Sequence, residues 1–179
     1  MTPRIAPVEL EDGDPSVQEL LAPLGERSSS NFFRTLVRHP RIFKRWIPYG
    51  HVLLKGSLPA RDRELLVLRA AHRAQSPYEW FHHEPIAADS GLSDKEIARV
   101  RLGPAEKGWS DADATVLRAA DELIDTHTLS DATWQLLSDR YDEQQLIEVP
   151  MVVGLYYSMG FALNSFGVQP EPDITGAGG

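Results

Sequence analysis

Hydrophobic residues recur along most of the chain at intervals of three and four, the spacing that gathers them on one face of an α-helix. This spacing predicts helices over residues 31–37, 41–54, 60–74 and 77–89. A proline stands at or next to the start of the last three, where its missing backbone N–H costs no hydrogen bond. The strict alternation that marks a β-strand is nearly absent, so the sequence predicts an all-α fold.

Further helix starts are predicted from serine caps. The segment from Ser93 to Glu96 has the capping-box pattern, and capping-type patterns also begin at Ser110 and Ser130. Each predicts a short helix. A last helix is expected over residues 142–166, and Pro150 should kink it or divide it in two.

Composition narrows the class of protein. The chain has 179 residues, which suits one compact domain, and its 18 Lys and Arg against 26 Asp and Glu give a net charge of −8. An acidic chain without a basic run lacks the charge that attracts nucleic acid. The first 14 residues do not resemble a signal peptide, and the apolar run over residues 149–163 is shorter than a membrane span needs. We therefore expect a cytoplasmic protein that binds neither nucleic acid nor membrane.

The sequence has no cysteine. Disulfides, thiolate nucleophiles, iron–sulfur clusters and thiolate zinc sites are therefore excluded. Acid–base chemistry and metal sites built from His and carboxylates stay open.

One stretch carries residues suited to such chemistry. At 100° per residue, Ser76, Glu79, Trp80 and His83 share one face of the predicted helix, whereas His82 points away. A carboxylate and an imidazole one turn apart can exchange a proton, can form a two-ligand metal site, or can be an ordinary solvated pair. The spacing alone favours the solvated pair.

Other polar and aromatic residues have structural interpretations. Glu64, near the start of its helix, is typical of a capping or ion-pairing acid. The tryptophans and the pair Tyr156 and Tyr157 are typical of core or interface anchors. Gly154, Ser158 and Ala162 recur every four residues, and such small side chains let another backbone approach, in a core or at a subunit contact.

Three sequence segments, which follow one another along the chain, change these structural interpretations. They are Leu58-Pro-Ala-Arg-Asp-Arg-Glu-Leu-Leu-Val-Leu-Arg69, Tyr78-Glu-Trp-Phe-His-His-Glu-Pro-Ile-Ala87 and Gly91-Leu-Ser-Asp-Lys-Glu-Ile97. Together they resemble the carboxymuconolactone decarboxylase and alkylhydroperoxidase D-like family, and the likeness covers about residues 30–168. The resemblance implies a single-domain helical bundle with an active-site helical hairpin and assembly into homo-oligomers, trimers or hexamers. It divides the chain into an N-terminal extension over 1–27, the helical domain over 28–168 and a flexible tail over 169–179.

The resemblance also indicates which branch of the family is involved. In the peroxidase branch a glutamate is followed twelve residues later by Cys-x-x-Cys-x-x-x-His. Counted from Glu64, the two cysteines fall on Ser76 and Glu79, and the histidine falls on His83. Because thiol peroxidase chemistry needs a peroxidatic and a resolving sulfur, this chain resembles the cysteine-free, decarboxylase-like side of the family.

The resemblance implies a cofactor-independent and metal-independent lyase or isomerase acting on a small acidic carbonyl compound or lactone. Glu64, Glu79 and His83 are the expected catalytic residues, with Glu79 orienting His83. Ser76, Trp80, Arg69 and Arg73 are the expected substrate-binding residues, the arginines holding a carboxylate. The alternatives are a non-catalytic oligomeric scaffold and, less favoured, a peroxidase that uses an external thiol.

Overall fold

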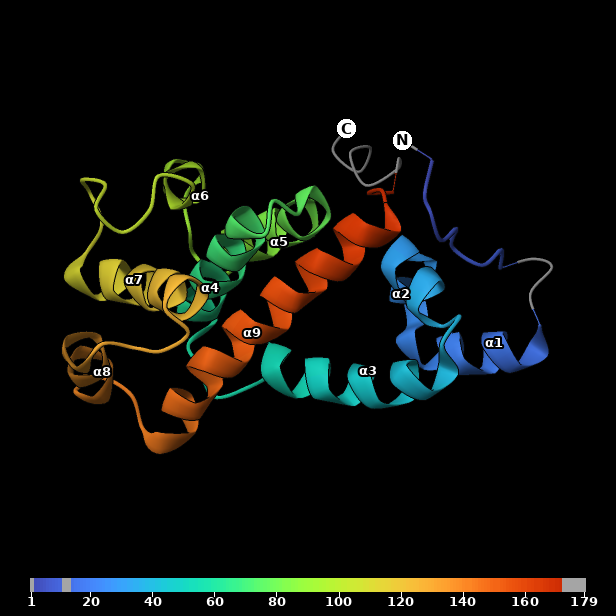
Figure 1. Cartoon of the computed structure of the whole chain (residues 1–179), viewed down its shortest axis with the longest axis horizontal. Coiled ribbons are helices and arrows are strands. Elements are labelled where there is room, and N and C mark those ends of the chain that lie inside the picture. Colours follow the sequence, from blue (N-terminus) through green and yellow to red (C-terminus); the bar gives the residue numbers. More distant parts are fainter. Residues whose placement is uncertain (1, 11–13, 172–179) are drawn as a thin grey trace. The chain divides into compact units, whose positions relative to one another are not determined.

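The regular elements of the protein are all helical in the part of the chain that the structure covers (Figure 1). This structure is a computed structural model that describes residues 2–10 and 14–171. The predicted all-α fold is confirmed. The Cα positions group into two units, one of residues 1–51 with 162–179 and one of residues 52–161.

The first unit is built from short helices around a small core. Leu21, Val37 and Phe43 are its buried centre. Two segments that lie far apart in the sequence also meet in this unit. The backbone N–H of Arg4 donates to the carbonyl of Phe166 at 2.7 Å. The elements are α1 (Pro15–Leu21), the 3₁₀ helix η1 (Ala22–Ser29), α2 (Asn31–Leu36) and the larger part of α3 (Pro40–Leu54).

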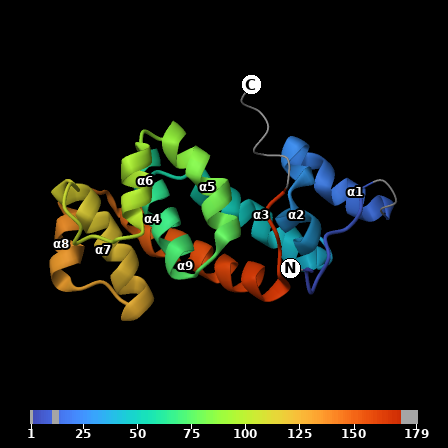
Figure 2. The same cartoon turned by 90° about the horizontal axis from the view of Figure 1, so that it is seen from above.

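The second unit is organised around one central helix. Its elements are α4 (Ala60–Arg73), α5 (Pro77–Asp89), α6 (Asp94–Val100), α7 (Asp111–Asp125), α8 (Asp131–Ser138) and most of α9 (Glu143–Phe166). Every residue of α4 from Glu64 to Ala71 is buried, and α5, α6 and α7 all contact this helix (Figure 2). A helix enclosed on all sides must find a partner for each charged group it carries.

The serine caps behave as the sequence predicts. Ser93 forms a capping box with Glu96 at the start of α6. The side chains of Ser110 and Ser130 accept hydrogen bonds from the backbone N–H groups of Asp113 and Thr133 at the starts of α7 and α8. These bonds satisfy donors that the first turn of a helix leaves free.

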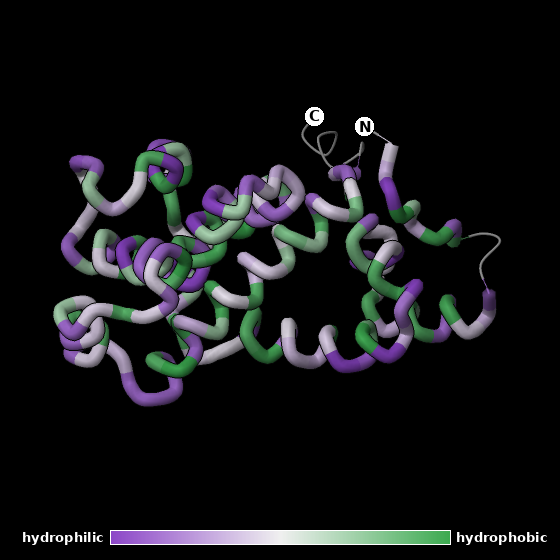
Figure 3. Tube along the Cα trace, in the orientation of Figure 1, coloured by the Kyte–Doolittle hydropathy of each residue, from purple (hydrophilic) through white to green (hydrophobic). Residues whose placement is uncertain are grey.

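Helix α9 runs without a break from Glu143 to Phe166, so Pro150 does not divide it in two. Figure 3 shows hydrophobic residues along most of its length. By length and composition α9 could cross a membrane, but core helices of soluble proteins pass the same test, and 44% of its apolar window is buried inside the protein. Within the second unit its inner face carries Val149, Val152 and Leu155.

Candidate active site

The turn between α4 and α5 brings the candidate residues together. Gln75 turns the chain with a φ of 51°, a left-handed backbone conformation that residues other than glycine rarely adopt. Ser76 then caps α5, its hydroxyl accepting from the backbone N–H of Glu79 at 3.4 Å. The two helices form a hairpin in which His83 of α5 meets Glu64 of α4, and Glu79 lies on the other side of the His83 ring.

The central contact of the site is a hydrogen bond between Glu64 and His83. Glu64 Oε2 lies 2.8 Å from His83 Nδ1. The other carboxylate oxygen, Oε1, accepts from Nε of Arg63 at 3.1 Å. A carboxylate has no proton to donate, so the Glu64 carboxylate can only accept from the imidazole. We therefore assign the Nδ1 proton to His83, and its Nε2 carries the lone pair whenever the ring is neutral.

Nε2 of His83 faces the second acid. It lies 3.8 Å from Oε2 of Glu79, beyond hydrogen-bond distance. Burial raises the pKa of the Glu79 carboxyl above its ordinary value, and the charges of His83 and His82 offset part of that rise. Glu79 therefore holds its proton at a higher pH than a solvent-exposed glutamate does.

The three side chains are shielded from solvent. Glu64, Glu79 and His83 are 0%, 2% and 7% exposed. The ordinary solvated pair favoured by spacing alone does not describe Glu79 and His83, because both are buried. The arrangement instead places the Glu64 carboxylate, the His83 imidazole and the Glu79 carboxyl, whose pKa is raised, in a row, which is a route for moving a proton.

Two further residues support His83 and were not among the predicted site residues. Arg63 holds Glu64 as described above. Tyr156 of α9 packs its ring against His83 edge to face, with ring centroids 4.8 Å apart. The sequence indicated Tyr156 only as a core or interface anchor, and Arg63 showed no signal beyond its place in a charged run.

The predicted substrate-binding residues lie in varied surroundings. Ser76 is buried as the cap of α5. Trp80 is 8% exposed, with the guanidinium of Arg101 4.1 Å from its ring centroid. Its indole N–H has no hydrogen-bond acceptor within the described residues.

Arg69 and Arg73 are held by acids of α7. Arg69 binds both carboxylate oxygens of Asp121, at 2.8 and 2.9 Å, and Arg73 binds Asp121 at 2.7 Å and also pairs with Asp125. Arg69 donates in addition to the carbonyls of Val100 and Arg101. Through these bonds both guanidinium groups link α4 to neighbouring segments. Their role in holding a substrate carboxylate stays a prediction.

The sequence of this region matches a known family. Residues 40–122, which include Glu64, Glu79 and His83, match the sequence profile of the Carboxymuconolactone decarboxylase family. This match agrees with the family resemblance that the sequence indicated, and the chain has no cysteine. No curated protein matches the chain.

Solved structures with the same fold are distant in sequence. An alkylhydroperoxidase AhpD core protein from Ralstonia eutropha JMP134, described as an uncharacterized peroxidase-related protein, is 16% identical, with a TM-score of 0.79 and 94% of each chain covered. An uncharacterized peroxidase-related protein from Silicibacter sp. TM1040 is 12% identical, with a TM-score of 0.78 and coverage of 96% of this chain and 95% of that one. A variant of the debrominase Bmp8 in complex with 2,3,4-tribromopyrrole is 14% identical, with a TM-score of 0.73 and coverage of 96% and 94%. At these identities the likeness establishes the fold alone.

Proposed function

We propose that the protein is a cofactor-independent lyase or isomerase that acts by general acid–base catalysis on a small acidic carbonyl compound or lactone. The observation that carries the proposal is the buried row formed by Glu64, His83 and Glu79. The match of residues 40–122 to the profile of the Carboxymuconolactone decarboxylase family supports it. The absence of sulfur at positions 76 and 79 separates the proposal from thiol peroxidase chemistry.

In this proposal Glu64, rather than Glu79, orients His83, because Glu64 is the acid within hydrogen-bond distance of the ring. A carboxylate on Nδ1 fixes the ring orientation and stabilises the imidazolium that forms when Nε2 takes up a proton. Arg63 balances the charge of that carboxylate. Glu79 is then free to exchange a proton with the reacting molecule or with Nε2.

In an isomerisation, Nε2 of His83 removes a proton from the carbon next to a carbonyl group and an enolate forms. Glu79 donates its proton to a second carbon or to the enolate oxygen, and the proton on His83 then returns to Glu79, which restores both groups. In a decarboxylation, carbon dioxide leaves with its bonding electrons staying on the substrate, and Glu79 or the His83 imidazolium protonates the resulting carbanion. Both routes use groups that this chain supplies.

The proposal is tested by turnover of small keto acids and lactones in deuterated water, followed by NMR for carbon dioxide release, ring opening or deuterium incorporation. We expect turnover by the wild-type protein and a loss of at least about 100-fold in Glu64→Gln and in His83→Ala, the range that general acid–base groups contribute. His82→Ala is the matched control, because this neighbouring imidazole stacks on Tyr78 instead of facing Glu64.

Retention of most of the activity in His82→Ala is the expected result. Equal losses in His82→Ala and His83→Ala, or full activity in His83→Ala, would contradict the assignment. Failure of the wild-type protein to turn over any member of the panel would favour the non-catalytic alternative.

A further inference from the structure

A groove between α7 and α8 lies outside the candidate active site. It has a volume of about 390 Å³, within the range of small-molecule sites. Glu64, Glu79 and His83 do not line it. The residues that matter to its chemistry are Asp111, Ala112, Arg118, Leu136, Leu137 and Arg140.

The guanidinium of Arg118 has unused hydrogen-bond donors. Glu122, one turn further along α7, is close enough for the charge of Arg118 to act on it. Its carboxylate already accepts from the backbone N–H of Ser130 at 2.8 Å, from the Ser130 hydroxyl at 3.0 Å and from the Thr133 hydroxyl at 2.8 Å. Arg118 itself makes no hydrogen bond or ion pair within residues 2–10 and 14–171.

Arg140 is also incompletely used. Its Nη2 lies 2.7 Å from Oδ2 of Asp62, an oxygen that accepts from the Tyr141 hydroxyl as well, at 2.6 Å. That contact occupies one of the five N–H donors of the guanidinium. The Arg140 side chain is 38% exposed and lines the groove, so it has donors left for a ligand.

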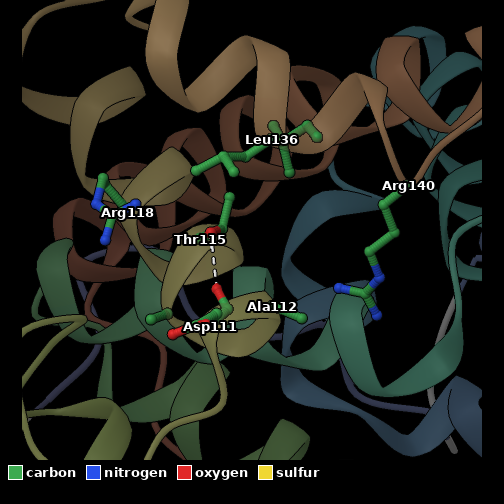
Figure 4. Close-up of a pocket in the computed structure, with 8 residues that line it drawn as sticks. Asp111, Ala112, Thr115, Arg118, Leu136 and Arg140 are labelled. Atoms are coloured by element: carbon green, nitrogen blue, oxygen red, sulfur yellow. Dashed lines mark hydrogen bonds between the residues drawn. The ribbon is translucent and has the colours of Figure 1, made fainter.

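Figure 4 shows how these groups are arranged. Arg118 and Arg140 lie on opposite sides of the groove, with Thr115 and Leu136 between them. Leu136 is 50% exposed, Leu137 is buried, and both line the groove, so the space between the cations has an apolar wall. The Asp111 carboxylate also borders the groove and would repel an anionic group placed next to it, which leaves the arginines as the positions where a negative charge is favourable.

We propose that this groove binds a small organic dicarboxylate, one carboxylate on Arg118, the other on Arg140, and the carbon chain between them against Leu136. Guanidinium groups bind carboxylates through paired N–H donors, which favours a planar carboxylate over a spherical anion. An apolar segment between two charges also distinguishes this ligand from inorganic phosphate. The site would be a second one, separate from the proposed catalytic residues.

The experiment is a titration of the full chain with adipate, hexanoate and inorganic phosphate, followed by calorimetry and by the NMR signals of the Leu136 and Thr115 methyl groups. We expect adipate to shift both signals and to bind more tightly than hexanoate or phosphate. Affinity for adipate should fall at least tenfold in Arg118→Gln and in Arg140→Gln. It should change less than twofold in Lys107→Gln, which removes one exposed positive charge elsewhere in the same unit.

His83→Ala separates this proposal from the proposed function. Adipate binding that persists in His83→Ala and is lost in Arg118→Gln supports the groove, whether or not the protein is an enzyme. Binding that is lost in His83→Ala and kept in Arg118→Gln places the ligand in the candidate active site and overturns the groove proposal. The groove proposal is also overturned if millimolar adipate shifts neither methyl signal, or if Lys107→Gln lowers the affinity for adipate as much as Arg118→Gln does. Because Arg140→Gln also removes a partner of Asp62, Arg118→Gln decides the result if that variant does not fold.

Discussion

Glu79 couples the stability of the protein to pH. Its pKa is raised by burial above the ordinary value of 4.5, so the folded chain binds this proton more tightly than the unfolded chain does. A raised pKa contributes stability that is fully present below the ordinary value and is lost as the pH rises through the folded value. We therefore expect burial of Glu79 to destabilise the protein increasingly above about pH 5.

Glu79→Gln removes this dependence because the amide does not titrate. Thermal unfolding at about pH 5 and about pH 8 should show a gain in Tm for the variant over the wild type that is larger at the higher pH. In a chain of this size, about 1 kcal/mol of unfolding free energy corresponds to about 2–4 °C in Tm, so the difference is measurable. Glu84→Gln, at an exposed position of the same helix, is the control and should follow the wild type. Parallel curves for the wild type and Glu79→Gln would show that Glu79 titrates normally.

At the level of single residues, the sequence predicts side-chain pairs that are close along one helix and misses pairs that tertiary packing creates. The spacing of Glu79 and His83 placed both on one face, but Glu64 became a candidate only through family resemblance. Neighbouring residues on a helix normally diverge, so the bond between Arg63 and Glu64 could not be inferred from their adjacency. The partner of Arg69 is 52 residues away, and no local pattern indicates it.

Among the helices, α9 carries two glycines, one tightly packed and one with open space beside it. A Cβ atom at Gly160 would lie 2.5 Å from Cβ of Ala74 and 3.4 Å from Cβ of Ser76, so the helix packs closely on the turn that leads into the active-site hairpin. A Cβ atom at Gly154 would meet nothing within 4 Å. Gly160 is thus required by packing within the chain, whereas a side chain at Gly154 would meet nothing within the chain.

We expect Gly160→Ala to lower the free energy of unfolding by about 1–3 kcal/mol through overpacking. Gly154→Ala should raise it by about 0.5–1 kcal/mol through helix propensity. Urea unfolding of the two variants measures both effects under the same conditions. A stabilising Gly160→Ala would mean that α9 does not pack on Ala74 as described.

Helices with a complete local signal were predicted well, and those without one were not. The starts of α5, α6, α7 and α8 follow from a serine cap alone or with a proline. Helix α1 and η1 were not predicted, although the side chain of Asp14 caps α1 by accepting from the N–H of Ser16 at 2.8 Å. Pro150 was expected to kink or divide α9; the helix is not divided, and a kink at Pro150 stays a prediction.

For the whole molecule, the outer face of α9 is an apolar surface that a single chain leaves exposed. Ile147, Met151 and Phe161 are 66%, 42% and 53% exposed, and Gly154 and Ser158 lie between them on the same face. Their intervals of four and three residues are those of a seam between packed helices. The seam carries no charge, so we propose that it joins copies of this chain into the expected trimer or hexamer.

Light scattering coupled to gel filtration tests this proposal. We expect a mass of three or six chains for the wild type and a lower mass for Met151→Lys and Phe161→Glu. Both variants should keep a helical circular dichroism spectrum, because neither side chain belongs to the core. Ile42→Lys is the control, since it changes an apolar residue that is 48% exposed on α3. A wild-type protein that is monomeric at every concentration would contradict the proposal.

The run of charged residues that opens α4 has a consequence for the order of folding. Arg61 pairs with Asp113, 52 residues away, and Asp62 with Tyr141, 79 residues away, whereas Glu64 meets His83 only 19 residues away. Closing a short loop costs less chain entropy than closing a long one. The contact on which the proposed chemistry depends can therefore form while α4 and α5 are still a bare hairpin. The longer loops that Arg61 closes with Asp113 and Asp62 closes with Tyr141 cost more chain entropy, so we expect these contacts to form after it.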